Sequence, residues 1–267
     1  MKSNNIDNSI ISLLLVVMSV MIALIAFTLT SCTKIDDVEI PNNDTITVRE
    51  LSVIDIGIVD GSGNRYDTIR IGNQVWLDAN LITTKYNDST DILYPGIDKN
   101  QWISSNEGCY AWYNNDSASY SIYGALYNWK AVMSNKLCPV GYHVPTDNEW
   151  QQLEMYLGMS AYDANRYGIR GNNNEGGRLK GLSHWSQPNV GAVDQYGFNA
   201  IPSNIRYYNG EFWPWQYNGK ESVTYWTSTY DDNLNLAINR SLETNHGSIW
   251  RYRHSVLMGY SVRCIKN

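Results

Sequence analysis

The sequence contains little phenylalanine: 3 Phe stand against 20 Tyr and 10 Trp in 267 residues. Tyr and Trp bury large areas, but each keeps a polar tip that needs a hydrogen-bond partner or water. The chain also contains 20 Gly and many Asn, which favour turns over long regular elements. This composition predicts a loop-rich domain built from short strands.

An excess of positive charge is also missing. The chain has 20 Lys and Arg against 26 Asp and Glu, for a formal net charge of −6. Proteins that bind nucleic acid usually present a basic face to the phosphates. The charge balance therefore disfavours a nucleic-acid partner.

Several signatures of catalysis and of repeat folds are absent. The sequence has no H-E-x-x-H, G-x-S-x-G, P-loop or dinucleotide-binding pattern, and Gly171–Gly177 lacks the Lys-Ser/Thr ending of a phosphate loop. No two cysteines form a C-x-x-C pair, which excludes zinc-ribbon and thioredoxin-like sites. No repeat of roughly 20–50 residues is present, which disfavours a solenoid or propeller.

The longest apolar run lies at the N-terminus, from Ile10 to Leu29. It ends in Leu29-Thr30-Ser31-Cys32, which has the lipobox pattern of an aliphatic residue, two small residues and Cys. This order predicts a cleavable signal peptide over residues 1–31 and a diacylglycerol anchor on Cys32. The alternative is a transmembrane anchor, because about 20 apolar residues can span a bilayer.

The segment 32–50 has the composition of a lipidated N-terminus followed by a polar linker. Thr33 stands where an inner-membrane retention signal would have Asp, and Lys34-Ile35-Asp36-Asp37 resembles the acidic export tag of surface lipoproteins from Bacteroidetes. We therefore expect an outer-membrane lipoprotein exposed at the cell surface, with a periplasm-facing domain as the alternative. Residues 51–267 are long enough for one large domain.

Alternating apolar residues and turn clusters predict most of the regular structure as strands. A tight hairpin is expected where Gly72-Asn73 separates two such runs, and Asn87–Asn106 and Gly171–Gly177 read as loops, the second of them flexible. The expected strands are Leu51–Val59, Tyr66–Ile71, Gln74–Leu77, Phe198–Ile205, Val223–Ser228, Leu236–Arg240, Ser248–Tyr252 and Ser261–Ile265.

Two helices are predicted. The first spans Tyr123–Met133, where Leu126, Trp129 and Met133 recur at helical spacing. The second follows Thr146, which forms a capping box with Glu149, and Gly158 is placed to end it in the left-handed conformation. Core packing is the expected role of both apolar stripes.

Besides Cys32 the chain has three cysteines, Cys109, Cys138 and Cys264. An exported domain favours a disulfide, and three sulfur atoms allow one bridge with one cysteine left over. A leftover thiol could be nucleophilic only with a His base and an orienting group, and His143, His184, His246 and His254 stand in no recognisable catalytic signature. A structural thiol is the favoured interpretation, as is a structural, hydrogen-bonding role for His143.

Many ordered segments resemble the Fibrobacter succinogenes major paralogous domain, a family common in exported lipoproteins of Bacteroidetes. The resemblance covers nearly everything after the linker and names an architecture more than an activity, since no molecular function is defined for the family. The segments that carry it are Ile71–Trp76, Asn80-Leu81, Thr83–Asp88, Trp112–Asp116, Tyr123–Trp129, Leu137–Trp150, Gly197–Ala200, Tyr225–Thr229 and Ser261–Cys264.

A more distant resemblance bears on the fold. His143–Trp150 is similar to a segment of formylglycine-generating and related sulfatase-modifying domains, and Ser261–Cys264 is similar to their terminal strand. The resemblance implies an α+β, C-type-lectin-like fold with short, mostly antiparallel strands, two helices and long irregular loops. It also implies the pairing Cys138–Cys264, with Cys109 left over. His143 replaces the Arg of those domains and their copper-binding cysteine pair is not visible, so their oxidase chemistry is not expected here.

Two surface sets are candidates for ligand contact. Asp231, Asp232, Asn233 and Asn235 lie near where C-type lectins carry calcium ligands, and Ca²⁺ takes about six to eight oxygen atoms. The alternative for these residues is a polar turn. C-type lectins also carry a sugar-specifying triplet, and the nearest sequence here, Gln187-Pro188-Asn189, differs from the related glutamine-proline-aspartate form at its last residue.

The second set is aromatic. Tyr207, Tyr208, Phe212, Trp213, Trp215 and Tyr217 cluster around Pro214, and the residues expected to face a ligand are Tyr208, Trp213, Trp215 and Tyr217. Aromatic side chains often anchor interfaces, although core packing is expected to use half or more of this cluster.

These observations favour a non-enzymatic, membrane-anchored recognition module for glycans or surface proteins. No cofactor is expected, and calcium at the acidic turn is the one candidate. One alternative is an enzyme related to the sulfatase-modifying domains. The other is a structural component of an adhesive surface assembly.

Overall fold

The computed structural model describes residues 57–214 and 221–267. Chain contacts divide the protein into Met1–Arg49 and Glu50–Asn267, and all described residues belong to the second unit. The predicted signal peptide, Cys32 and linker lie outside the described residues, as do Trp215 and Tyr217.

One four-stranded antiparallel sheet joins the start, middle and end of the domain. Its order is β3 (Thr68–Ile71), β4 (Gln74–Leu77), β12 (Ile265–Lys266) and β7 (Tyr142–His143). The predicted hairpin at Gly72-Asn73 is confirmed, because Ile71 pairs with Gln74 and Ile69 with Trp76. Ile265 then pairs with both Trp76 and His143, so the last strand closes the sheet.

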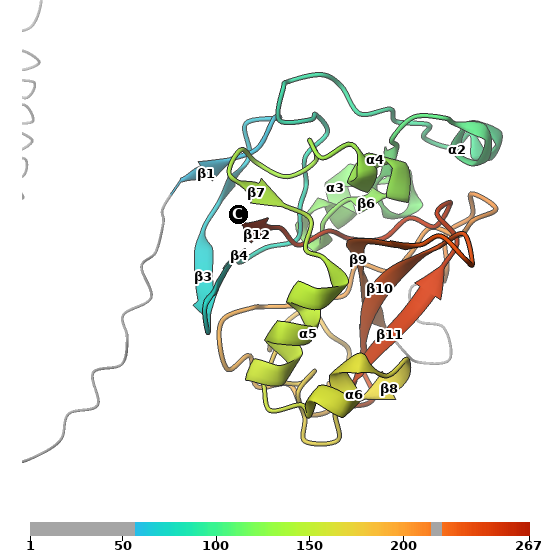
Figure 1. Ribbon diagram of the computed structural model, residues 1–267. Coiled ribbons are helices and arrows are strands. Elements are labelled where there is room, and N and C mark those ends of the chain that lie inside the picture. Colours follow the sequence, from blue (N-terminus) through green and yellow to red (C-terminus); the bar gives the residue numbers. More distant parts are fainter. Residues whose placement is uncertain (1–56, 215–220) are drawn as a thin grey trace, which may run out of the picture. The chain divides into compact units, whose positions relative to one another are not determined.

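The second four-stranded sheet is also antiparallel and comes mainly from the C-terminal third. Its order is β8 (Gly168–Arg170), β11 (Ile249–His254), β10 (Leu236–Glu243) and β9 (Ser222–Asp231). Helix α5 (Asp147–Tyr156) lies between the two sheets (Figure 1). Two further sheets have two strands each, β1 (Ile58–Val59) with β2 (Arg65–Tyr66), and β5 (Tyr110–Ala111) with β6 (Leu126–Tyr127).

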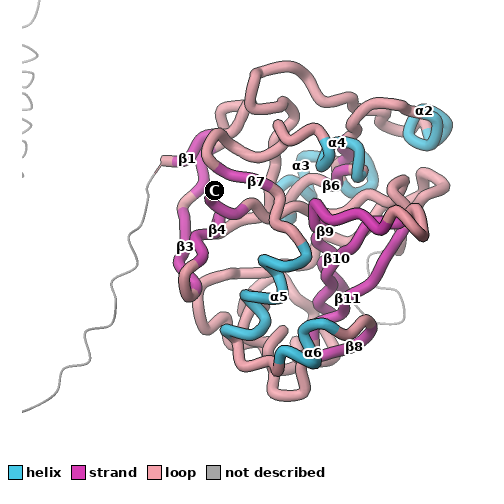
Figure 2. The backbone as a smooth tube through the Cα atoms, in the orientation of Figure 1, coloured by secondary structure: helices cyan, strands magenta, loops and turns pink. Residues whose placement is uncertain are grey.

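Loops connect these short elements over much of the described chain (Figure 2), so the predicted mixed fold with mostly antiparallel strands and long irregular loops is confirmed. The count of two helices is wrong for the described residues. Besides α5 they hold α2 (Lys99–Ser104), α3 (Ser117–Tyr120), α4 (Trp129–Met133), α6 (Ala161–Asn165) and the 3-10 turns η1 (Tyr113–Asn115) and η2 (Ser121–Tyr123).

The second predicted helix is confirmed and the first is wrong in its N-terminal half. Thr146 and Glu149 form the expected capping box of α5, and Gly158 follows the helix with φ of +105°. In the first helix, Leu126-Tyr127 form β6 instead, because Tyr127 exchanges backbone hydrogen bonds with Tyr260. The helix starts only at Trp129, after the side chain of Asn128 caps the backbone N–H of Ala131.

Three predictions of local structure need correction. The expected loop Asn87–Asn106 contains α2, capped by Asp98. The expected strand Phe198–Ile205 forms only an isolated bridge at Ala200, because positive φ at Asn199 and Asn204 interrupts the extended backbone.

The third correction concerns the expected strand Ser261–Ile265. Only its last residue belongs to a regular strand, β12, whereas Ser261 makes a single bridge to Tyr225.

The loop Gly171–Gly177 is packed rather than flexible. Glu175 is only 1% exposed, and the N–H groups of Gly176 and Gly177 both donate to the carbonyl of Gly247. A Cβ on Gly176 would lie 2.4 Å from the backbone oxygen of Ser248. The glycines therefore serve close packing of two backbones.

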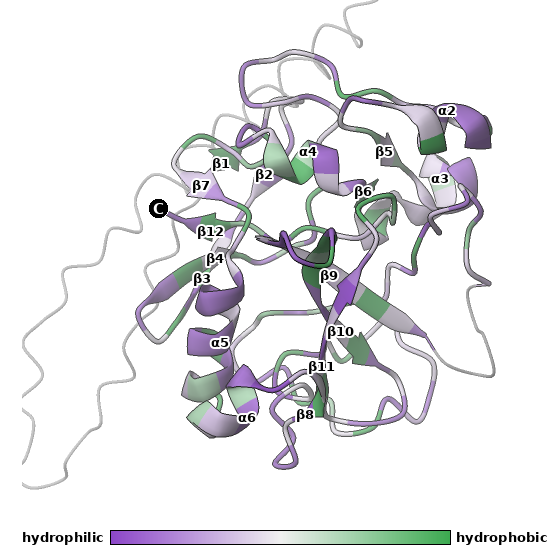
Figure 3. Ribbon diagram, turned by 45° about the vertical axis from the view of Figure 1, so that its right-hand side comes forward, coloured by the Kyte–Doolittle hydropathy of each residue, from purple (hydrophilic) through white to green (hydrophobic). Residues whose placement is uncertain are grey.

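Two hydrophobic cores lie on opposite faces of the second sheet. Side chains alternate between the faces of a strand, so Tyr225 and Leu242 join one core while Trp226 and Ala237 join the other. Tyr and Trp fill much of both cores, as the composition predicted. Figure 3 shows that hydrophilic residues dominate much of α5, although this helix packs between sheets.

The disulfide Cys138–Cys264 is present, with its α-carbons 5.9 Å apart, and Cys109 is a buried free thiol. The bridge spans 126 residues of sequence and ties the terminal strand to the segment that enters β7 and α5. Such a long closed loop is worth several kcal/mol in the chain-entropy model.

Hydrogen bonds of His143 also connect the C-terminus to the start of α5. Its Nε2 lies 2.9 Å from Oε1 of Glu149 and its Nδ1 lies 2.7 Å from Oδ1 of Asn267. The hydrogen bond to Glu149 raises the pKa of His143 despite partial burial. The imidazolium therefore links the C-terminus to the start of α5.

We expect this link to give a stability that depends on pH. Because the folded pKa of His143 is raised above its unfolded value of about 6.5, the contribution is complete below that value and is lost as pH rises through the folded pKa. Thermal midpoints of the wild type and His143→Gln should differ most near pH 5 to 6 and converge in mild alkali. A difference that stays constant over this range contradicts the assignment.

Candidate functional site

Strand β11 carries two chemically different faces. Ile249, Arg251 and Arg253 alternate along it with Trp250, Tyr252 and His254, so the two sets point to opposite sides of the sheet. The arginine face meets α5, and the aromatic face points the other way. The candidate site is built from both faces.

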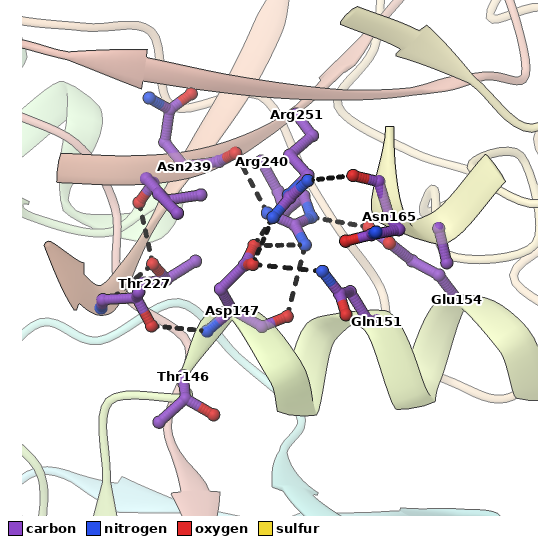
Figure 4. A network of polar contacts seen from close by, with 12 residues as sticks. Thr146, Asp147, Gln151, Glu154, Asn165, Thr227, Asn239, Arg240 and Arg251 are labelled. Atoms are coloured by element: carbon purple, nitrogen blue, oxygen red, sulfur yellow. Dashed lines mark hydrogen bonds and ion pairs between the residues drawn. The ribbon is translucent and has the colours of Figure 1, made fainter. Parts of the chain in front are cut away.

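On the first face, α5 buries two carboxylates against three arginines. Figure 4 shows two of the arginines, Arg240 and Arg251, with both acids. Glu154 receives Arg170 through two bonds of 2.7 and 2.9 Å and Nε of Arg240 at 2.6 Å. Asp147 receives Nη2 of Arg240 at 2.8 Å and two bonds from Arg251 at 2.5 and 2.9 Å. We call these five residues the arginine–carboxylate network.

Every charge in the network has a partner of opposite sign, although the network is buried. Burial alone would raise the pKa of Asp147, but hydrogen bonds and charges from Arg251 and Arg240 outweigh burial and hold that pKa below its ordinary value. The side chains of Glu154 and Arg170 have no exposed area. Since charge pairs of this kind depend on geometry, the network holds α5, β8, β10 and β11 in one arrangement.

The ring of Tyr167 extends the network toward the sheet edge. The guanidinium groups of Arg251 and Arg253 lie 4.0 and 3.4 Å from its centroid, within the range of a cation–π contact. Arg253 also pairs with Asp231 at 2.7 Å. The contacts of Arg251 and Arg253 therefore hold β11 in place on the face that meets α5.

On the opposite face, rings form a continuous row. Centroids lie 5.4 Å apart between His246 and Trp250, 5.3 Å between Trp250 and Tyr252, and 5.8 Å between Tyr252 and His254. All four side chains are partly exposed. We call these four residues the aromatic row; it ends where Nδ1 of His254 meets the hydroxyl of buried Tyr260 at 2.6 Å.

Polar groups lie beside the row on the same face. Ser241 is paired across the sheet with Trp250, and Asn239 with Tyr252. Asn239 is fully buried, and within the described residues neither atom of its side-chain amide has a hydrogen-bond partner. Unsatisfied buried amides are unusual and point to a water or a ligand group. Burial lowers the pKa of His254, so this end of the row is neutral near physiological pH.

Comparison with known proteins identifies the family. Residues 69–266 match the model of the Fibrobacter succinogenes major domain. The chain belongs to this family. No curated protein and no solved structure matches the chain.

The predicted calcium residues lie in the turn that joins β9 to β10 of the major domain. Asp231 uses one carboxylate oxygen for Arg253 and accepts the N–H of Asn233 with the other, and Oδ1 of Asn235 accepts the hydroxyl of Tyr230 at 3.3 Å. No group of three or more His, Cys, Asp or Glu suited to a metal occurs in residues 57–214 and 221–267. Calcium binding by Asp231, Asp232, Asn233 and Asn235 stays a prediction.

Of the predicted ligand-facing aromatics, Tyr208 is 56% exposed. Trp213 stacks on Tyr207 at 4.8 Å, and its carbonyl accepts bonds from Tyr113 and Asn204. Trp213 thus has a structural role in the major domain. The aromatic row itself was missed, although the alternation Trp250-Arg251-Tyr252-Arg253-His254 is a strand pattern that sorts rings from charges.

Two further features concern the thiol of Cys109 and the length of the described helices. Burial raises the pKa of the Cys109 thiol, which disfavours the thiolate that nucleophilic chemistry needs. In the part of the chain that the structure describes, no helix is long and apolar enough to span a bilayer.

Loss of one carboxylate should disrupt the arginine–carboxylate network. In Glu154→Gln, Arg170 and Arg240 lose their ionic partner inside the protein, so we expect a loss of about 3–5 kcal/mol in the free energy of unfolding. Urea denaturation measures it. The matched control is Asp163→Asn, which removes an exposed pair with Arg166 and should change little; equal losses in both variants contradict the role of the network.

Proposed function

We propose that this major domain is a surface-displayed recognition module that binds glycans on the aromatic row. The observation that carries the proposal is a line of four partly exposed rings, three on β11 and His246 just before it, with hydrogen-bonding groups beside the line. Sugar rings have apolar C–H faces bordered by hydroxyl groups. Flat rings with polar edges suit such ligands, since they offer apolar contact and hydrogen bonds together.

The spacing of the row supports an extended ligand. Successive ring centroids are 5.3 to 5.8 Å apart from Trp250 to His254, a step comparable to the length of one sugar ring. Ile169, which is 48% exposed and paired with Trp250, continues the apolar surface onto β8. A chain of several sugars would therefore contact more than one ring.

Rigidity supports the proposal as well. Binding is weakened when side chains or strands must be ordered first. The arginine–carboxylate network holds β11 from the opposite face through Arg251, so the strand that bears the row is ordered before any ligand arrives. The partly exposed hydroxyl of Ser241 supplies an adjacent polar group.

The C-type-lectin-like fold belongs to this proposal. It is supported by the mixed antiparallel architecture and by the bridge from Cys138 to the terminal Cys264, the pairing that the resemblance to sulfatase-modifying domains implies. Export is supported by the same bridge, because disulfides persist in oxidising compartments.

We propose that Cys32 anchors the protein in the outer membrane with the domain at the cell surface. The support is the lipobox Leu29-Thr30-Ser31-Cys32 at the end of the apolar run. Cys32→Ala should abolish labelling with a radioactive fatty acid and leave an uncleaved precursor, as seen by gel mobility. Normal cleavage and acylation of this variant would exclude the anchor.

Glycan binding is tested with the mature domain on an array of host and plant glycans, followed by titration of the best ligand. Trp250→Ala removes the central indole and should weaken binding about tenfold. The matched control is Tyr162→Ala, because Tyr162 is 76% exposed on α6 and lies outside the row. Absence of binding above background, or equal loss in both variants, rules out the row as a glycan site.

A further inference from the structure

Arg206 is a buried cation without a carboxylate partner. It has no exposed area, and its guanidinium lies 4.4 Å from the ring centroid of Trp102 and 5.0 Å from that of Phe212. Nε donates to the carbonyl of Gly210 at 3.0 Å and Nη2 to that of Gly96 at 3.1 Å. Nη1 is buried and has no hydrogen-bond partner within the described residues.

Other buried arginines of this domain have more partners, although Nε of Arg170 and Nε of Arg263 also lack one within the described residues. Arg170, Arg240 and Arg251 each pair with a carboxylate. Arg263 has none, but it donates to four acceptors, two more than Arg206. An uncompensated buried charge is costly, and burial lowers the pKa of Arg206 to about 10, which still leaves the side chain protonated near neutral pH.

Arg206 lines a pocket of about 370 Å³. Phe212 gives the pocket an apolar wall, and Asn114 and Asn115 give it a polar one. The Oδ1 atom of Asn115 is also buried without a partner in the described residues. Two unsatisfied polar groups therefore belong to side chains that line the same pocket, whose volume falls in the range of small-molecule sites.

The rim of the pocket carries an exposed ion pair. Nζ of Lys99 lies 2.8 Å from Oε1 of Glu211, and the two side chains are 54% and 58% exposed. Exposed pairs of this kind are weak because water screens them. The charge of Glu211 is thus balanced at the rim, while the charge of Arg206 is not balanced inside.

We propose that this pocket binds a carboxylate-bearing small molecule the size of one sugar ring, with the carboxylate on Arg206. A guanidinium and a carboxylate make strong, directional hydrogen bonds, and Nη1 is the free donor for them. The flat ring of Phe212 would contact the apolar face of the ligand, and the amide of Asn115 a hydroxyl group. The pocket is built from other residues than the aromatic row, so the two proposals stand or fall separately.

The test compares two probes that differ at one carbon. Glucuronate carries a carboxylate where glucose has a hydroxymethyl group, and binding to the mature domain is followed by titration calorimetry and by Trp fluorescence, since Trp102 stacks on Arg206. We expect glucuronate to bind at least about tenfold more tightly than glucose. Equal affinity for the two sugars, or no heat and no fluorescence change with glucuronate, overturns the proposal.

Variants locate the site. Asn115→Asp adds a carboxylate to the pocket beside the unpaired cation, so it should abolish glucuronate binding and raise the thermal midpoint. Lys99→Gln should weaken binding severalfold, whereas its matched control Lys136→Gln, which breaks an equally exposed pair with Asp88, should not. Trp250→Ala should leave glucuronate binding unchanged. Unaltered binding in both pocket variants places the site elsewhere and refutes the assignment.

Discussion

The arrangement of this domain depends on the charge pairing between α5 and the second sheet. Asp147 and Glu154 enter the interior from a helix rich in polar residues, and three guanidinium groups from β8, β10 and β11 meet them there. Each of these charges would be costly to bury alone. They are tolerated together because every carboxylate oxygen in the pair of acids receives at least one arginine donor.

This pairing also decides which side chains reach the other face of the sheet. Because the period of a strand is two residues, placing Arg251 and Arg253 toward the helix sends Trp250, Tyr252 and His254 outward. A shift of one residue in the register of β11 would bury the rings and expose the arginines. The aromatic row and the network are therefore two consequences of one register.

A buried charge with hydrogen-bond partners also holds loops together. The ammonium group of Lys180 is buried and donates to the carbonyls of Val190, Glu243 and His246 at 2.7 to 3.2 Å, so it joins two loops that are far apart in sequence. Arg206 is the contrasting case, since its side chain donates to only two groups, both backbone carbonyls, and it lines a pocket. The combination of few partners and a pocket is what points to a ligand.

The sequence by itself determined the features whose signals lie in neighbouring residues or in ordered motifs. The capping box of Thr146 and Glu149, the hairpin at Gly72-Asn73 and the family were all predicted, and the resemblance to sulfatase-modifying domains led to the bridge Cys138–Cys264. Short-range hydrogen bonds and backbone preferences act within a few residues, so local patterns carry that information.

Only the tertiary structure decided the network, the pocket of Arg206 and which face of β11 meets α5. Arg251 and Asp147 are 104 residues apart, and Arg240 and Glu154 are 86 apart, so no local pattern reveals that they meet. The tertiary structure also decided Leu126-Tyr127. The spacing of apolar residues there predicted a helix, but pairing with Tyr260 and β5 makes the segment a strand. Distant partners override weak local propensity, because buried polar groups and backbone ladders must be satisfied wherever the chain brings them together.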